Sequence, residues 1–129
     1  ILKPGQKLPD SIISKIYFAD IVIADLTDVK TNKRINVNVA YEYGIASGMI
    51  SLAKIILKSD KSGINDIKTQ SQKQLFAIVN KKSKIDIDKQ FSDIKGIIYG
   101  EYEKSVLDNK TEKVIISSIN KLYKMKNSD

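Results

Sequence analysis

Apolar positions near the start of the chain follow two spacings, one typical of helices and one typical of buried strands. Residues 10–19 carry isoleucines at helical spacing, with Asp10 placed to cap the start of a helix. Residues 20–25, DIVIAD, are apolar and β-branched between two aspartates, which predicts a strand buried on both faces, as in parallel sheets. A polar loop at residues 26–36 follows. The first part of the chain therefore predicts a helix, a strand and a loop.

The remaining apolar positions continue this alternation without an internal repeat or a linker. The predicted elements are a helix at residues 38–52, a buried strand at 53–59, a loop at 60–72, a strand or a short helix at 73–82, a strand at 95–102 and an amphipathic helix at 111–126. This order predicts a single α/β domain over residues 1–129, with a mainly parallel sheet flanked by helices.

The predicted helix at residues 38–52 carries small side chains along its length, among them Gly44 and Gly48. Each interior glycine lowers helix propensity by about 1 kcal/mol relative to alanine. We expect tight packing against the sheet, or the approach of a ligand, to offset this cost.

Composition limits the chemistry that the chain can support. It contains neither cysteine nor histidine, which excludes disulfides, thiol nucleophiles and the commonest general base. Carboxylates, tyrosines, lysines or hydroxyls must therefore carry any catalysis. No apolar run approaches the roughly 18 residues of a membrane span, and no secretory signal is visible. We expect a cytoplasmic protein with no membrane partner, and an upstream segment before Ile1, since the chain does not start with methionine.

The charge balance favours anionic partners only weakly. The net charge is +7, from 22 basic and 15 acidic residues, and the pI is about 9.5. Arg34 is the only arginine, whereas bidentate recognition of bases and phosphates relies on arginine. We therefore interpret the lysines as a solvated surface and do not expect nucleic acid to be the partner.

Two carboxylates lie where a parallel sheet would bind a ligand, beyond the carboxyl ends of its strands. Asp25 ends the predicted strand, and Glu42 lies in the opening turns of the next helix. Asn38 is a good N-cap, but a capping box would need its acid at Tyr41, so that motif does not explain Glu42. Glu42 can interact with the helix dipole or with a ligand. Asp25 can cap the following turn or bind the hydroxyls of a ribose.

Other polar groups near these carboxylates give weaker signals. Thr27 offers a further ligand contact, and of Tyr41 and Tyr43 one should pack in the core while the other lies near the pocket. Asp86 and Asp88 alternate as a metal pair would, although a solvated strand edge explains them better. Neither the P-loop nor the dinucleotide fingerprint is present, and we expect no bound cofactor and no metal.

The stretch ADIVIADLT, followed by NVNVAYEYGIA, resembles a motif of TIR-like and nucleoside 2-deoxyribosyltransferase-like nucleotide-binding domains of bacteria. The stretch covers about a fifth of the chain. It departs from the motif at Tyr43, where the family has leucine. The matching residues are Ala19, Asp20, Ala24, Asp25, Leu26, Thr27, Asn36, Asn38, Val39, Tyr41, Glu42, Gly44 and Ala46.

The resemblance implies a fold, a set of site residues and a link to bacterial defence. The fold would be a flavodoxin-like or deoxyribosyltransferase-like three-layer sandwich, whose first strand we expect upstream of this chain. Glu42 would be the nucleophile on the anomeric carbon of a sugar, and Asp25 would contact the ribose or the base. Thr27, Asn38 and Tyr41 would be further ligand contacts. Related domains often assemble, so the resemblance also implies a homo-oligomer.

Three hypotheses follow for function. The first is a domain that binds a nucleoside, a nucleotide or an NAD-type molecule and cleaves or exchanges an N-glycosidic bond through Glu42, with NAD as a substrate rather than a cofactor. The second is a non-catalytic sensor of a nucleotide-derived signal. The third is a basic domain that interacts with nucleic acid or protein.

Overall fold

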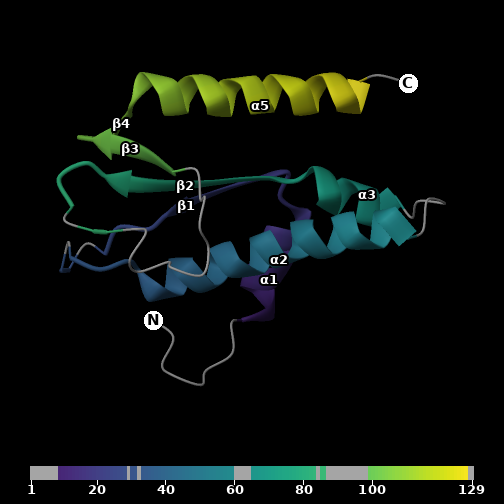
Figure 1. Ribbon diagram of the computed structural model, residues 1–129, viewed down its shortest axis with the longest axis horizontal. Helices are drawn as coiled ribbons and strands as arrows, with labels where there is room; N and C mark the ends of the chain where they lie inside the picture. The colour runs from purple at the N-terminus through teal and green to yellow at the C-terminus, as the bar shows by residue number, and fades with distance from the viewer. Residues whose placement is uncertain are drawn as a thin grey trace.

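The computed structural model describes residues 9–28, 30–31, 33–59, 65–83, 85–86 and 99–127. In this part of the chain a four-stranded sheet lies between helices (Figure 1). The elements are α1 (Asp10–Phe18), β1 (Ile21–Asp25), α2 (Val37–Ser59), α3 (Asn65–Gln72), β2 (Gln74–Asn80), β3 (Tyr99–Glu103), β4 (Val106–Leu107) and α5 (Asn109–Asn127).

The sheet has the strand order β1-β2-β3-β4. Strand β2 pairs in parallel with β1 and with β3, whereas β4 pairs antiparallel with β3. Helix α2 lies on one face of the sheet and α5 on the other (Figure 1). The prediction of an α/β domain flanked by helices is therefore confirmed. The sheet is mixed, with β1, β2 and β3 as its parallel part.

The main core lies between α2 and the sheet. Ala24 of β1 and Ala77 and Val79 of β2 pack with Tyr43 of α2. Because successive residues of a strand point to opposite faces, a buried Ala24 on the α2 side directs the next residue, Asp25, to the α5 side. This alternation decides the geometry of the candidate site.

Helix α2 is longer than predicted, and the strand predicted at residues 53–59 is wrong. No proline or glycine interrupts the chain between Gly48 and Ser59. Ala53 is buried two helical turns after the buried Ala46, so the inner face of the helix continues without a break. The apolar run AKIILKS therefore extends α2 instead of crossing the sheet.

The predicted loop at residues 60–72 is wrong in its second half, because α3 forms there and packs against α2. Residues 73–82, left open between strand and helix, contain β2. The strand predicted at residues 95–102 appears as β3 from Tyr99 onward, and its earlier residues lie outside the described part of the chain.

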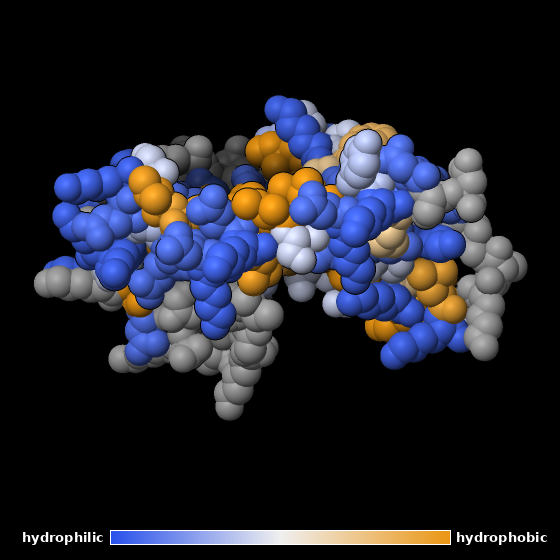
Figure 2. Space-filling model, turned by 90° about the horizontal axis from the view of Figure 1, so that it is seen from above, coloured by the Kyte–Doolittle hydropathy of each residue, from blue (hydrophilic) through white to orange (hydrophobic). Residues whose placement is uncertain are grey.

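Strand β1 forms where predicted, but it is not buried on both faces. Ala24 is buried, whereas Ile23, which points to the α5 side, is 47% exposed. Helix α5 packs mainly on β3, so it leaves this side of β1 open within the described residues. Figure 2 views the molecule from above, where polar side chains dominate and apolar ones gather near the middle.

The first and last helices, α1 and α5, start differently. Pro9, not Asp10, occupies the N-cap position of α1, and no side chain of residues 9–28 or of the other described ranges caps this helix. At α5, Asp108 is a side-chain cap: Oδ1 accepts a hydrogen bond from the Thr111 amide (2.7 Å) and Oδ2 from the Glu101 amide (2.8 Å). Asp108 thereby joins the start of α5 to β3. None of the described helices is long and apolar enough to cross a membrane.

Lys73 closes the end of α1 and ties it to the start of β2. Its ammonium donates hydrogen bonds to the carbonyl oxygens of Ile16 (2.7 Å) and Tyr17 (3.0 Å), and to that of Ala19. All three ammonium donors are thus used, and they satisfy carbonyl groups that a helix end leaves without partners.

Candidate functional site

The carboxyl ends of the parallel strands bring together Asp25 of β1 and Tyr102 of β3. The Tyr102 hydroxyl donates a hydrogen bond of 2.7 Å to Oδ2 of Asp25. The amide of Thr27 donates one of 3.0 Å to Oδ1 of the same carboxylate. Asp25 is exposed, so it keeps open acceptor positions toward solvent. The structure therefore shows the first role considered for Asp25, holding the turn that follows β1, and leaves its carboxylate accessible at the carboxyl ends of the strands.

Tyr102 is a site residue that sequence reasoning missed. Burial raises the pKa of its hydroxyl, the hydrogen bond to Asp25 raises it further, and the Thr27 hydroxyl acts in the opposite direction. A neutral hydroxyl next to a carboxylate can donate to Asp25 and accept from a ligand. The signal available in the sequence was a tyrosine at the carboxyl end of the third predicted strand.

Thr27 belongs to the framework of this edge and does not offer a free ligand contact. Its side chain is buried, and its hydroxyl oxygen accepts a hydrogen bond of 2.8 Å from the amide of Asn80. Its backbone also forms an isolated bridge with Ile35. Thr27 therefore fixes the loop after β1 against the end of β2.

Asn36 caps the start of α2, so the prediction that Asn38 is the N-cap is wrong. Oδ1 of Asn36 accepts hydrogen bonds from the amides of Asn38 (3.1 Å) and Val39 (3.3 Å). Asn38 is thus the second residue inside the helix, where its side chain is half-buried. The capping-box position falls on Val39, so that motif still does not explain Glu42.

Glu42 lies in the second turn of α2 and is half-buried. This position is past the first turn, where the helix dipole has most of its effect, so the dipole explains Glu42 less well than expected. Ala46, one turn later on the same helix, is fully buried. Glu42 and Asp25 share one end of the sheet but belong to opposite faces, and the structure does not bring them into contact.

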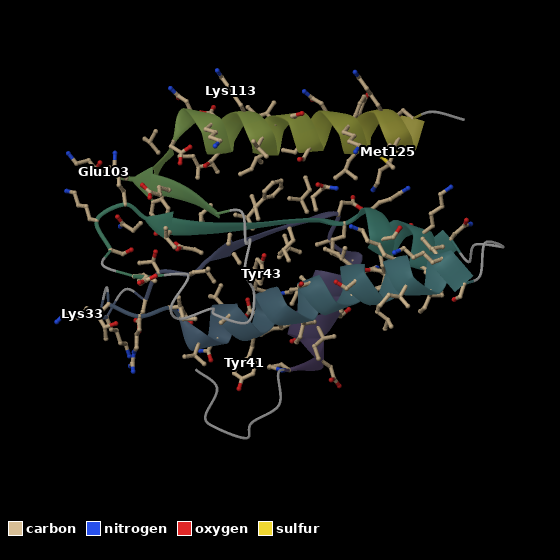
Figure 3. All side chains as sticks on the ribbon, in the orientation of Figure 1. Lys33, Tyr41, Tyr43, Glu103, Lys113 and Met125 are labelled. Carbon is tan, nitrogen blue, oxygen red and sulfur yellow. The ribbon has the colours of Figure 1, made fainter. Side chains whose placement is uncertain are left out.

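The two neighbouring tyrosines of α2 point in different directions, as predicted. Figure 3 shows Tyr43 on the sheet side of α2 and Tyr41 on the opposite side. Tyr43 is buried in the core, whereas Tyr41 is 61% exposed. The structure therefore separates Tyr41 from the edge formed by Asp25 and Tyr102.

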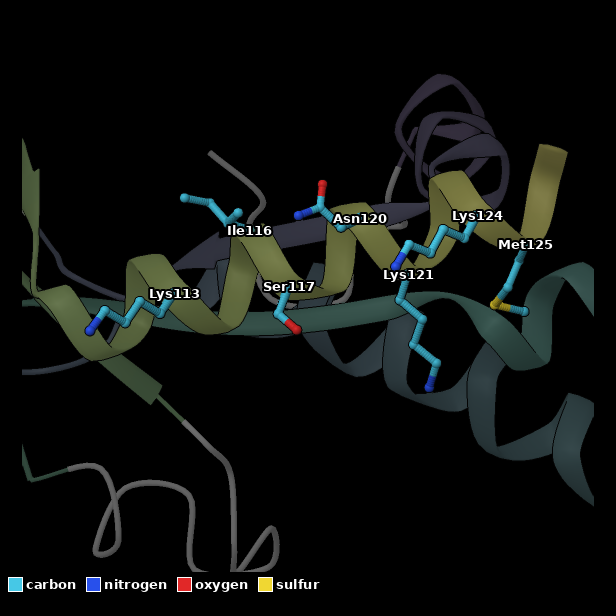
Figure 4. Close-up of a pocket in the computed structure, with 7 residues that line it drawn as sticks. All are labelled: Lys113, Ile116, Ser117, Asn120, Lys121, Lys124 and Met125. Carbon is cyan, nitrogen blue, oxygen red and sulfur yellow. The ribbon is translucent and has the colours of Figure 1, made fainter. Parts of the chain in front are cut away.

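Four recesses on the described surface lie away from Asp25 and Glu42. A shallow one of about 600 Å³ follows α5, where Lys113, Lys121 and Lys124 surround Ser117 and Asn120 (Figure 4). Others lie between α3 and the end of α5, beside Gly100, and between α1, α2 and α3. None of these four recesses is lined by Asp25 or Glu42.

The structure gives no support to the alternative metal pair. Asp86 is exposed and lies outside any strand, and Asp88 lies outside the described residues. Across the described ranges, no three histidine, cysteine, aspartate or glutamate side chains gather as a metal site.

Comparisons of the chain with protein-family models, with curated proteins and with solved structures found no match.

Proposed function

We propose that this chain is a nucleoside- or nucleotide-binding domain that cleaves or exchanges an N-glycosidic bond through Glu42. It would share the three-layer fold of the TIR-like and deoxyribosyltransferase-like domains that it resembles. The observation that carries the proposal is the position of two carboxylates. Asp25 ends β1 and Glu42 lies near the start of the helix that follows, at the end of the sheet where α/β domains bind ligands.

The proposed reaction uses Glu42 as a nucleophile. One of its carboxylate oxygens bonds to the anomeric carbon of the sugar as the N-glycosidic bond breaks, and the base leaves with the bonding electrons and gains a proton from water. Water or a second base then displaces Glu42 and restores the carboxylate. The half-buried position of Glu42 supports this role, because its side chain is held by the fold and still reachable from solvent.

Asp25 and Tyr102 would bind the sugar or the base of the ligand. The Asp25 carboxylate accepts hydrogen bonds from hydroxyl groups, and Tyr102 keeps it in place. Because Asp25 points to the α5 side and Glu42 belongs to the α2 side, a ligand that contacts both must lie across the strand ends.

A second candidate function is a non-catalytic sensor that binds a nucleotide-derived signal at the same edge. The hydrogen bonds of this edge favour it. Both oxygens of Asp25 already accept a hydrogen bond, and the Thr27 hydroxyl accepts one from Asn80. Because the Asp25 carboxylate and the Thr27 hydroxyl hold β1, β2 and β3 together, they can form a fixed binding surface. The same hydrogen bonds leave them poorly placed to transfer protons.

The test is incubation of the protein with NAD and with a panel of nucleosides and nucleotides, followed by chromatography for the released base. Glu42→Gln removes the nucleophile. Glu103→Gln is the matched control, since within the described part of the chain Glu103 forms an ion pair with the exposed Lys82 at 3.5 Å. Circular dichroism verifies that both variants fold.

Base release that Glu42→Gln abolishes and Glu103→Gln preserves supports the enzyme. Binding without release, measured by calorimetry, supports the sensor. The absence of both release and binding refutes both functions. Binding of DNA or RNA that falls steeply with salt would favour the basic interaction domain instead.

A further inference from the structure

The outer face of α2, turned away from the sheet, is largely apolar from Val37 to Ile55. Its large side chains are Val37, Tyr41, Leu52 and Ile55, which are 57%, 61%, 60% and 63% exposed. The charged side chains of α2 are Glu42, Lys54 and Lys58, and helical spacing places none of them along the centre of this face. A helix that is apolar on both its inner and outer faces is typical of one buried on both sides.

Two glycines occupy the middle of the same face. A Cβ atom placed on Gly44 or Gly48 would meet nothing within 4 Å in the described structure. The expected packing of these glycines against the sheet is therefore wrong, because Tyr43 and Ala46 make that contact. Glycine is unfavourable inside a helix, and nothing in the described fold offsets it. Small residues at this spacing allow the backbone of another helix to approach closely.

The apolar residues are arranged almost symmetrically about the glycine pair, whose midpoint is Ala46. Val37 and Ile55 lie at equal separations on either side of that midpoint, and Tyr41 and Leu52 lie at nearly equal ones. A two-fold axis through the midpoint would set α2 against an antiparallel copy of itself. Val37 would then meet Ile55, and Tyr41 would meet Leu52, as a self-complementary dimer interface requires.

A recess beside Leu52 is lined in part by Gln70, a side chain with an unpaired acceptor in the described structure. It has a volume of about 180 Å³, and its lining includes Tyr17, Met49, Leu52, Ile56, Ile67 and Gln70. The Gln70 side chain is buried, and its Nε2 donates to the carbonyl oxygen of Tyr17 at 2.8 Å. Its Oε1 is buried and has no hydrogen-bond partner among the described residues. A buried acceptor of this kind normally has a partner.

We propose that two copies of this chain form a dimer through antiparallel α2 helices that cross at Gly44 and Gly48. Tyr41 of each copy enters the recess beside Leu52 of the other. The side chain of the partner's Gln70 turns toward the recess, and its Oε1 accepts a hydrogen bond from the Tyr41 hydroxyl. A tyrosine suits this recess because it combines an apolar ring with a terminal donor. The inference does not depend on the proposed catalytic function.

The test is sedimentation equilibrium of the whole chain over a range of concentrations. Gly48→Leu places a large side chain where the helices would touch and favours the helix in the monomer. The expected result is a dimer for the unmodified chain and a dissociation constant raised about tenfold or more in Gly48→Leu. Ser117→Leu on the exposed surface of α5 is the matched control and should leave the dimer unchanged.

A second measurement addresses the hydroxyl of Tyr41. Tyr41→Phe should raise the dissociation constant about fivefold, because it leaves the Gln70 acceptor buried without a donor. The same change in a Gln70→Leu background should have little further effect. A chain that stays monomeric at all concentrations overturns the proposal, as does a dimer that Gly48→Leu leaves intact. If Tyr41→Phe raises the dissociation constant as much in the Gln70→Leu background as in the unmodified chain, the assignment of the hydrogen bond is wrong.

Discussion

The hydroxyl of Tyr102 donates a hydrogen bond of 2.7 Å to the carboxylate of Asp25, across the β2 strand that separates them. This bond joins the first and third strands of the parallel part of the sheet at their carboxyl ends. It places a carboxylate and a hydroxyl with a raised pKa at the edge where we expect a ligand.

Tyr102→Phe tests the strength of this link. We expect the free energy of unfolding to fall by roughly 0.5–1.5 kcal/mol, because a partly exposed hydrogen bond is lost. The pKa of Tyr102 is raised above 10.0, so the bond contributes fully below pH 10.0 and is lost as the pH rises through the raised value. Urea unfolding of both proteins at neutral and alkaline pH measures the difference. An unchanged stability at neutral pH would show that the bond contributes nothing.

Lys73→Met tests the closure of α1. The substitution removes three hydrogen bonds, one buried to the carbonyl oxygen of Ile16 and two partly buried to those of Tyr17 and Ala19. Burial lowers the pKa of Lys73 and the charge of Asp20 raises it, so part of the loss is offset when the buried charge is removed. We expect a net destabilisation of about 1–3 kcal/mol in urea unfolding. Lys68→Met, on the exposed side of α3, is the control and should change stability little.

The stability of α5 should depend on pH, because Asp108 caps this helix most strongly when its carboxylate is ionised. Hydrogen bonds from the amides of Thr111 and Glu101 lower its pKa below the ordinary 3.8. Its contribution is therefore present above pH 3.8 and is lost as the pH falls through the lowered value. Asp108→Ala should destabilise the protein at neutral pH and weaken this acid dependence. Asp108→Asn should keep most of the neutral-pH stability, since asparagine is also a good N-cap. Equal urea midpoints for all three proteins at pH 7 would contradict the assignment.

Gly100→Ala tests the contact between β3 and α5. A Cβ on Gly100 would lie 2.1 Å from Oγ1 and 2.6 Å from Cβ of Thr111, so α5 must move. We expect a destabilisation of about 1–3 kcal/mol, typical of overpacking. Thr111→Ala should rescue the variant only in part, because the Cβ of residue 111 remains. Full stability in Gly100→Ala, measured by thermal unfolding, would mean that α5 is free to shift.

Local spacing predicted much of the secondary structure. Three elements form close to their predicted bounds: the helix at residues 10–19, the strand at 20–25 and the C-terminal helix. Each was predicted from a pattern of apolar positions that lies wholly within the element itself. The prediction of a strand at residues 53–59 was wrong, because a short apolar segment fits a buried strand and a buried helix equally well. Only the burial of Ala46 and Ala53 along one helix face decided between them.

The sequence by itself determined the helix and strand at the start of the chain, the C-terminal helix, the exclusion of cysteine and histidine chemistry, and the position of Asp25 at the end of a strand. Only the tertiary structure decided which residues share an edge. It paired Asp25 with Tyr102, buried Thr27, capped α2 with Asn36 and turned Tyr41 and the two glycines outward. The physical reason is that spacing along the chain fixes which residues share a face, whereas the order and register of the strands fix which faces meet.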